Sequence, residues 1–167
     1  MAEPGVRIEH PNRRKAASKL TRAIVVLLLL VSAALVAIVT IGGWDALQGA
    51  KALQIAYVVV YVVLAFFVMR WSRGVLPLAA ALAVILLIFA AVSAPGWFDR
   101  DKPGFAQPAL DEGVLGLVTA LIVPVQLLLI AFAMSGFRQA WNVEVERPAD
   151  EPPPDRHERG GPAPAAA

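Results

Sequence analysis

The chain has 167 residues, of which 58% are hydrophobic and only 17% charged, and its formal net charge is +2. The charged residues fall in five stretches separated by four long apolar runs, a segregation typical of integral membrane proteins and not of soluble domains. The chain contains no cysteine, which excludes disulfides, thiolate metal sites and cysteine nucleophiles. Its basic residues lie beside the apolar runs, where membrane topology and lipid headgroups account for them, so we expect no nucleic-acid partner.

The first apolar run follows a basic segment, residues 1–22, that predicts a short cytoplasmic tail. The run covers residues 23–42, and at about 1.5 Å per residue it reaches across the roughly 30 Å hydrocarbon core of a bilayer. A cleaved signal peptide is the alternative, but its apolar core is typically about 7–15 residues long. We therefore predict that this run is a transmembrane helix.

Three further apolar runs predict three further spans. Each span is expected to be helical, because an isolated strand in lipid would leave its backbone donors and acceptors unpaired. The predicted fold is an all-α bundle of four transmembrane helices, occupying residues 23–137, with both termini on one side. The later spans are predicted at residues 52–69, 74–94 and 114–136, and the outer loops at residues 43–51 and 95–113.

The C-terminal segment, residues 138–167, is predicted to be a second cytoplasmic tail. From about residue 148 it consists of proline, alanine, glycine and charge without apolar periodicity, which predicts disorder. Its triple proline at residues 152–154 is only a weak signal for a polyproline II ligand. Residues 141–146 read Trp-Asn-Val-Glu-Val-Glu, and we expect this segment to dock on the cytoplasmic face of the bundle with both valines on one side.

The lysines and arginines predict the orientation. Twelve of the 15 lie in the two tails or in the turn after the second span, and three lie in the other loops. Positive residues stay in the cytoplasm, so both termini are expected there, in the plasma membrane. The excess of arginine over lysine, with abundant alanine, is typical of a GC-rich bacterial genome. Tryptophans follow the end of each run and are interpreted as interfacial anchors; they are Trp44, Trp71, Trp97 and Trp141.

Four residues within the spans are candidates for intramembrane polar contacts. Pro124 frees a backbone carbonyl one turn back, and Gln126 needs a hydrogen-bond partner at this depth. Tyr57 and Tyr61 are one helical turn apart and could reach Gln126. The simpler interpretation is that Gln126 bonds to a neighbouring helix; the alternative is a polar path for a small solute.

Cofactors and catalysis are not expected. No charged residue lies inside a predicted span, whereas ion-coupled transport generally needs one. The two histidines, His10 and His157, lie in the tails, where they cannot ligate a haem within the bundle. In the outer loop, Arg100 and Lys102 alternate with aspartates and would repel a calcium ion. We therefore expect no metal, no cofactor and no enzymatic activity.

The functional hypothesis follows from these exclusions. Small residues recur at four-residue spacing, as in Ala79 with Ala83 and Ala131 with Ser135, and such faces let helices approach closely within the bundle or in an oligomer. The sequence therefore favours a non-enzymatic accessory, assembly or structural component of a membrane complex. Its partners would be the bilayer and a second copy or another membrane protein. The alternative is a passive channel or small-solute transporter with a polar path near Tyr57, Tyr61 and Gln126.

Overall fold

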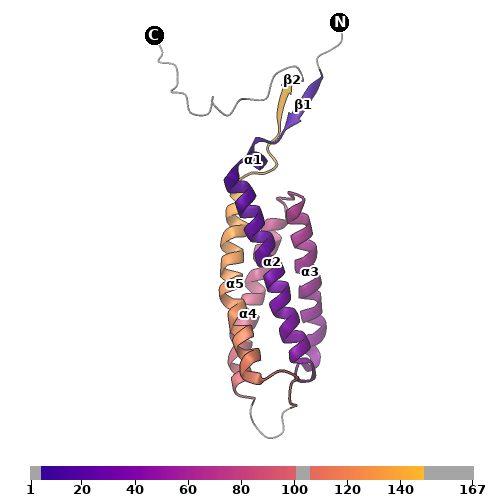
Figure 1. Cartoon of the computed structure of the whole chain (residues 1–167), viewed down its shortest axis with the longest axis vertical. Coiled ribbons are helices and arrows are strands. Elements are labelled where there is room, and N and C mark those ends of the chain that lie inside the picture. Colours follow the sequence, from indigo (N-terminus) through magenta and orange to yellow (C-terminus); the bar gives the residue numbers. More distant parts are fainter. Residues whose placement is uncertain (1–4, 101–105, 149–167) are drawn as a thin grey trace, which may run out of the picture.

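Four long helices form the body of the protein (Figure 1). The computed structural model describes residues 5–100 and 106–148, and four of the helices in these ranges are long and apolar enough to cross a membrane. The prediction of four long apolar helices is confirmed. These helices are α2 (Ala16–Gly42), α3 (Lys51–Met69), α4 (Val75–Phe98) and α5 (Glu112–Arg138).

The helices extend beyond the apolar runs that predicted them. Helix α2 begins seven residues before its run, and α4 continues through Pro95 to Phe98. Hydrophobicity marks where a helix can contact lipid, whereas backbone hydrogen bonding decides where the helix ends. The first outer loop is also structured, with two 3-10 turns, η1 (Trp44–Ala46) and η2 (Gln48–Ala50). At the start of α5, the Asp111 carboxylate accepts hydrogen bonds from the amides of Gly113 and Val114.

The helices do not pack evenly around the bundle. Helix α2 packs against both α3 and α5, and α5 packs against α4, but the consecutive helices α3 and α4 share little contact. Five alanines of α4 are buried, Ala79 and Ala83 among them, and such small side chains let a neighbouring helix approach closely, as α5 does. Ala131 and Ser135, by contrast, face outward from α5. The main core lies among α2, α3, α4 and α5, and the seam between α3 and α4 is its open side.

The two tails meet beyond the helical bundle, which departs from the predicted all-α fold. Strands β1 (Val6–Glu9) and β2 (Val145–Pro148) form an antiparallel pair in which Ile8 lies opposite Glu146. A four-residue helix, α1 (Pro11–Arg14), joins β1 to α2. Of residues 141–146, which were predicted to dock on the bundle, Trp141 and Asn142 do contact it, whereas Val145 and Glu146 pair with the N-terminal tail (Figure 1).

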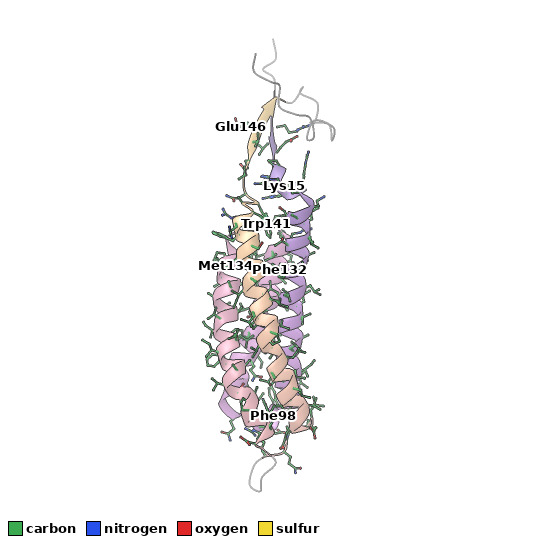
Figure 2. The ribbon with its side chains drawn as sticks, turned by 90° about the vertical axis from the view of Figure 1, so that its left-hand side faces the viewer. Lys15, Phe98, Phe132, Met134, Trp141 and Glu146 are labelled. Carbon is green, nitrogen blue, oxygen red and sulfur yellow. The ribbon has the colours of Figure 1, made fainter. Side chains whose placement is uncertain are left out.

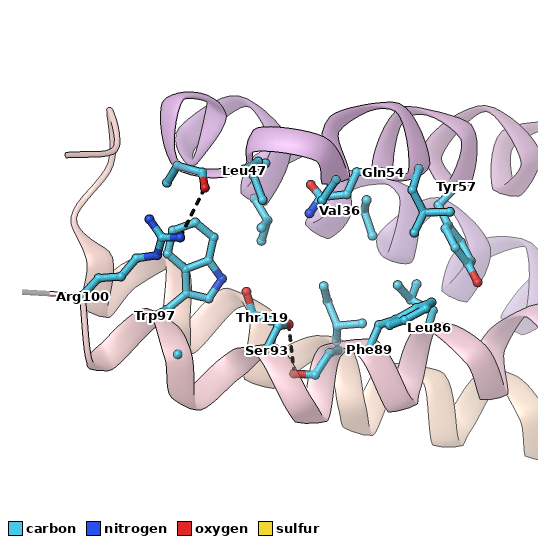
Figure 3. A pocket seen from close by; sticks show the side chains of 17 residues that line it. Val36, Leu47, Gln54, Tyr57, Leu86, Phe89, Ser93, Trp97, Arg100 and Thr119 are labelled. Atoms are coloured by element: carbon cyan, nitrogen blue, oxygen red, sulfur yellow. Dashed lines mark hydrogen bonds between the residues drawn. The ribbon is translucent and has the colours of Figure 1, made fainter. Parts of the chain in front are cut away.

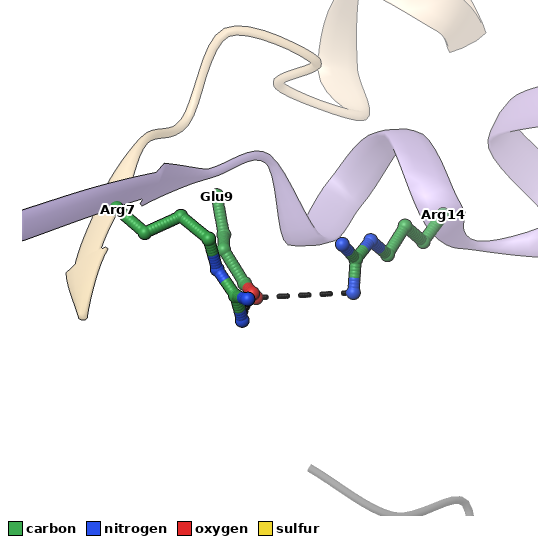
Figure 4. Close-up of polar contacts among 3 residues, drawn as sticks. All are labelled: Arg7, Glu9 and Arg14. Atoms are coloured by element: carbon green, nitrogen blue, oxygen red, sulfur yellow. Dashed lines mark hydrogen bonds and ion pairs between the residues drawn. The ribbon is translucent and has the colours of Figure 1, made fainter. Parts of the chain in front are cut away.

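A buried carboxylate joins strand β1 to the short helix α1 (Figure 4). Glu9 is 7% exposed and pairs with the Arg7 guanidinium, while Arg14 Nη1 lies 3.9 Å from the second Glu9 oxygen. A carboxylate this buried needs partners that compensate for its lost hydration. The two arginines provide that compensation from either side. The polyproline segment at residues 152–154 lies outside the described residues.

Arginines at the same end bind the free carbonyls of two helix C-termini. Arg22 donates to the Met69 carbonyl at 3.1 Å, and Arg73 Nε donates to the Phe137 carbonyl at 2.7 Å. The last carbonyls of a helix have no intrahelical partner and carry partial negative charge. These basic residues therefore stabilise the ends of α3 and α5, in addition to any role in membrane orientation.

The Arg73 contacts give the first prediction. Arg73 also donates to Asn142 Oδ1 at 3.0 Å and lies over the Phe137 ring, whereas Arg70 in the same turn is exposed. We expect Arg73→Ala to lower the free energy of unfolding by about 2 kcal/mol, the range for hydrogen bonds from charged donors. Arg70→Ala removes the same charge and should change it little. Unfolding of both variants in detergent micelles measures the difference; equal losses would contradict this role.

Candidate functional site

A cavity of about 520 Å³ lies between α3 and α4, at the end of the bundle away from the chain termini (Figure 3). The two helices leave the tight turn at residues 70–74 side by side and share little contact further along. Figure 3 shows Arg100 and Trp97 at one end of the cavity and Tyr57 and Leu86 at the other. The volume falls within the range of small-molecule sites, about 300–1,000 Å³.

The walls of the cavity are mostly apolar, and three of their polar side chains, Thr119, Ser93 and Gln54, lie within hydrogen-bonding distance of a partner. Thr119 donates to the Leu115 carbonyl at 2.7 Å, and Ser93 Oγ lies 3.4 Å from the Ala90 carbonyl. Gln54 Oε1 lies 2.6 Å from the Thr40 hydroxyl, which can donate to it. A surface of this kind suits an apolar or amphipathic molecule better than an ion.

The end of the cavity near the loops carries charge and aromatic rings. Arg100 Nη2 donates to the Ala46 carbonyl at 3.2 Å, and its guanidinium lies 5.1 Å from the centre of the Trp97 ring. Trp97 packs directly on Gly43, where an added Cβ would lie 2.6 Å from the ring. Only glycine permits this approach, which brings the ends of α2 and α4 together.

A second polar feature lies deeper in the bundle, fully buried. Tyr61 donates to Gln126 Oε1 at 3.0 Å, and Gln126 Nε2 donates to Ser32 Oγ at 2.9 Å. Ser32 in turn donates to the Leu28 carbonyl of its own helix at 2.7 Å. All three side chains are 0% exposed. This network, from Tyr61 through Gln126 to Ser32, joins α3, α5 and α2 through one chain of hydrogen bonds.

The other two candidates stand apart from this network. The Tyr57 ring contacts the Tyr61 ring edge-to-face at 5.7 Å, but its hydroxyl lies 3.5 Å from the Leu82 carbonyl, too long for a strong hydrogen bond. Tyr57 lines the cavity instead. Pro124 is exposed, and α5 continues through it. The sequence analysis missed Ser32, the third member of the network.

The four tryptophans differ in position, although each follows an apolar run. Trp44 is 44% exposed, and the Lys51 ammonium lies over its ring. Trp141 is 0% exposed and Trp97 only 6%, so at these two positions the ring is surrounded by protein, unlike the predicted headgroup anchors. Figure 2 places Trp141 at the end of α5, below the strand pair. Sequence position alone cannot distinguish a ring that faces headgroups from one that closes the end of a bundle.

Trp71 lies at the end of the bundle nearest the strand pair and takes a strained backbone conformation. Its φ of 64° lies in the left-handed region, normally a glycine position after a helix. Its ring is held edge-to-face by Trp141 at 5.4 Å and lies below the Arg22 guanidinium at 4.1 Å. These contacts offset a backbone cost of about 1–2 kcal/mol.

Metal binding finds no support in residues 5–100 and 106–148, which bring together no group of three histidine, aspartate or glutamate side chains. The predicted alternation of charge in the outer loop falls partly on residues 101–105, outside the described residues.

The buried network gives the second prediction. Tyr61→Phe removes one hydroxyl and leaves Gln126 Oε1 without its donor, so we expect a loss of about 1 kcal/mol in the free energy of unfolding. Tyr57→Phe is the matched control one turn away and should have little effect, because its hydroxyl makes only a long contact. Unfolding of both variants in detergent measures the difference. Equal losses in the two variants would contradict a stabilising role of the hydrogen bond from Tyr61 to Gln126.

Comparison with known proteins gives no indication of the function. No protein-family model, curated protein or solved structure matches this chain. The structural features that bear on its role are the lateral cavity, the buried network and the outward faces of the helices.

Proposed function

We propose that this protein is a non-enzymatic integral membrane protein that works through contacts within the bilayer, as an accessory or assembly component of a larger membrane complex. The observation that carries the proposal is the sealed network of Tyr61, Gln126 and Ser32. These deepest polar groups bond to one another and to the backbone, and all are 0% exposed. Polar groups arranged in this way fix how helices pack and are not available to a substrate.

The charge distribution supports the same role. In the described parts of the four long helices, the buried polar side chains are serine, threonine, tyrosine and glutamine, and none is ionisable near neutral pH. Proton-coupled and ion-coupled transport generally depend on an ionisable group at depth. A role through contacts makes no such demand.

The outer face of α5 offers a surface for these contacts. Ala131 and Ser135 are exposed one turn apart on α5, while the comparable pair of Ala79 and Ala83 is used inside the bundle. Small side chains let a second helix approach closely, and close packing drives helix association in lipid. This face is suited to a helix of another membrane protein or of a second copy.

The alternative, a passive path for a small solute, is favoured by one observation. The cavity reaches Tyr57, whose ring contacts Tyr61 at the start of the buried network. Beyond Tyr57, however, the network has no exposed surface, and passage would require its hydrogen bonds to open. The role through contacts needs no such rearrangement and is the one proposed.

The proposed orientation places both termini in the cytoplasm, with the protein in the plasma membrane. The strand pair brings the described ends of the chain together beyond one end of the bundle (Figure 1). That end carries twelve of the 15 lysines and arginines when the tails are included. The positive-inside rule then assigns it to the cytoplasmic side.

Single cysteines test the orientation, because the chain has none of its own. Ala17 and Gln107 are both exposed and lie near opposite ends of the bundle. In intact cells a membrane-impermeant maleimide should label Gln107→Cys, and should label Ala17→Cys only after the membrane is permeabilised. Labelling with the reverse pattern would contradict the orientation.

A photo-reactive amino acid tests the role through contacts. Placed at Ser135 in native membranes, it should yield a defined cross-link to a second protein or a second copy. The matched control is the same amino acid at Val92 on α4, which is 75% exposed and should yield no defined product. Purification in mild detergent should retain the same partner. A protein that remains monomeric and uncross-linked in both experiments would exclude the proposal.

A further inference from the structure

The cavity between α3 and α4 has one charged end and one apolar end, and it lies on the open side of the bundle. We propose that it holds one zwitterionic phospholipid, with an acyl chain between the two helices and the phosphate at Arg100. This inference goes beyond the proposed function, because it holds whether or not the protein has a protein partner.

The depth of the cavity matches one leaflet of a bilayer. Its lining residues follow α4 from Leu86 to Trp97, which at about 1.5 Å per residue is about 16 Å. Half of a hydrocarbon core of roughly 30 Å is about 15 Å. A cavity that starts at the end of the bundle and reaches Leu86 therefore ends near the middle of the membrane, as an acyl chain does.

The inner walls provide an apolar surface for such a chain. Apolar side chains from four helices line the cavity: Leu53 of α3, Leu86 and Phe89 of α4, Val36 of α2 and Ile122 of α5. Figure 3 shows Val36 and Tyr57 opposite Leu86 and Phe89. Packing along these side chains replaces the contacts that the chain would make with other lipids.

The end of the cavity near Arg100 and Trp97 provides charged partners for a lipid headgroup. Arg100 is held there by the Ala46 carbonyl and the Trp97 ring, and a guanidinium suits phosphate oxygens because it can serve several acceptors at once. The Lys51 ammonium is fixed over the Trp44 ring at the same end of α3. The carboxylates of Asp45 and Asp99 are exposed at this end as well. Mixed charge favours a headgroup with both a phosphate and an amine over one that is only anionic.

Substitutions at Ser93 can either fill the cavity or leave it open. Its side chain lines the cavity and is exposed, so Ser93→Leu places a larger side chain where the acyl chain would lie. Ser93→Ala removes the same hydroxyl without filling the space and is the matched control. Thermal unfolding of both variants establishes that they remain folded.

Native mass spectrometry of protein released from bilayer nanodiscs measures the bound lipid. The nanodiscs contain phosphatidylethanolamine, phosphatidylglycerol and diacylglycerol with matched acyl chains. Wild-type protein and Ser93→Ala should each retain one phosphatidylethanolamine in preference to the other two, and folded Ser93→Leu should lose it at least fivefold. Arg100→Gln should lose the preference for phosphatidylethanolamine over diacylglycerol.

Three results would overturn the proposal. One is equal lipid retention by Ser93→Leu and Ser93→Ala. Another is a wild-type protein that retains phosphatidylglycerol or diacylglycerol as well as it retains phosphatidylethanolamine. The third comes from native membranes: a photo-reactive amino acid at Phe89 that cross-links to a protein instead of a lipid would show that a helix occupies the seam.

Discussion

Hydrocarbon offers no hydrogen bonds, and the packing of this protein follows from how its polar groups are satisfied without water. The backbone is satisfied by forming helices, and the side chains are satisfied across them. Gln126 is the clearest case, because its amide uses both its oxygen and its nitrogen, on Tyr61 and Ser32. One glutamine thereby fixes the relative position of three helices. A shift of α5 along its axis would break both bonds at once, so the network specifies the register of the bundle as well as stabilising it.

A hydrocarbon solvent also accounts for the open seam between α3 and α4. In water, a gap between two apolar helices would be closed by the hydrophobic effect, since it exposes apolar surface. In lipid that driving force is absent, because acyl chains contact leucine and valine as well as another helix does. Helices α3 and α4 therefore need only the short turn that joins them, and the seam beyond it can be filled by a lipid. The cavity lies along this seam, with Arg100 at one end of it.

The end that carries the strand pair is held together by polar and aromatic contacts. Arginines there bind the terminal carbonyls of α3 and α5, and the indoles of Trp71 and Trp141 meet edge-to-face. The strand pair then joins the two tails, with Glu9 buried between arginines. The positive charges that orient a membrane protein thus also hold this bundle together. A basic residue near a span should be judged by its contacts as well as by the side of the membrane on which it lies.

The sequence by itself determined the number of spanning helices and their approximate extents, because hydrophobic length is a local property that each run carries alone. It also identified Gln126 and Tyr61 as polar groups in need of partners, since a polar side chain in an apolar run is visible without a fold. Only the tertiary structure decided that Ser32 completes the network, that Trp97 and Trp141 are buried and that α3 and α4 stand apart. Each of these depends on how the helices are rotated about their axes and which neighbours they meet, and nearly uniform apolar helices encode that rotation only weakly. The strand pair could not be predicted from the sequence either, because it joins segments more than a hundred residues apart. Its backbone hydrogen bonds do not depend on particular side chains.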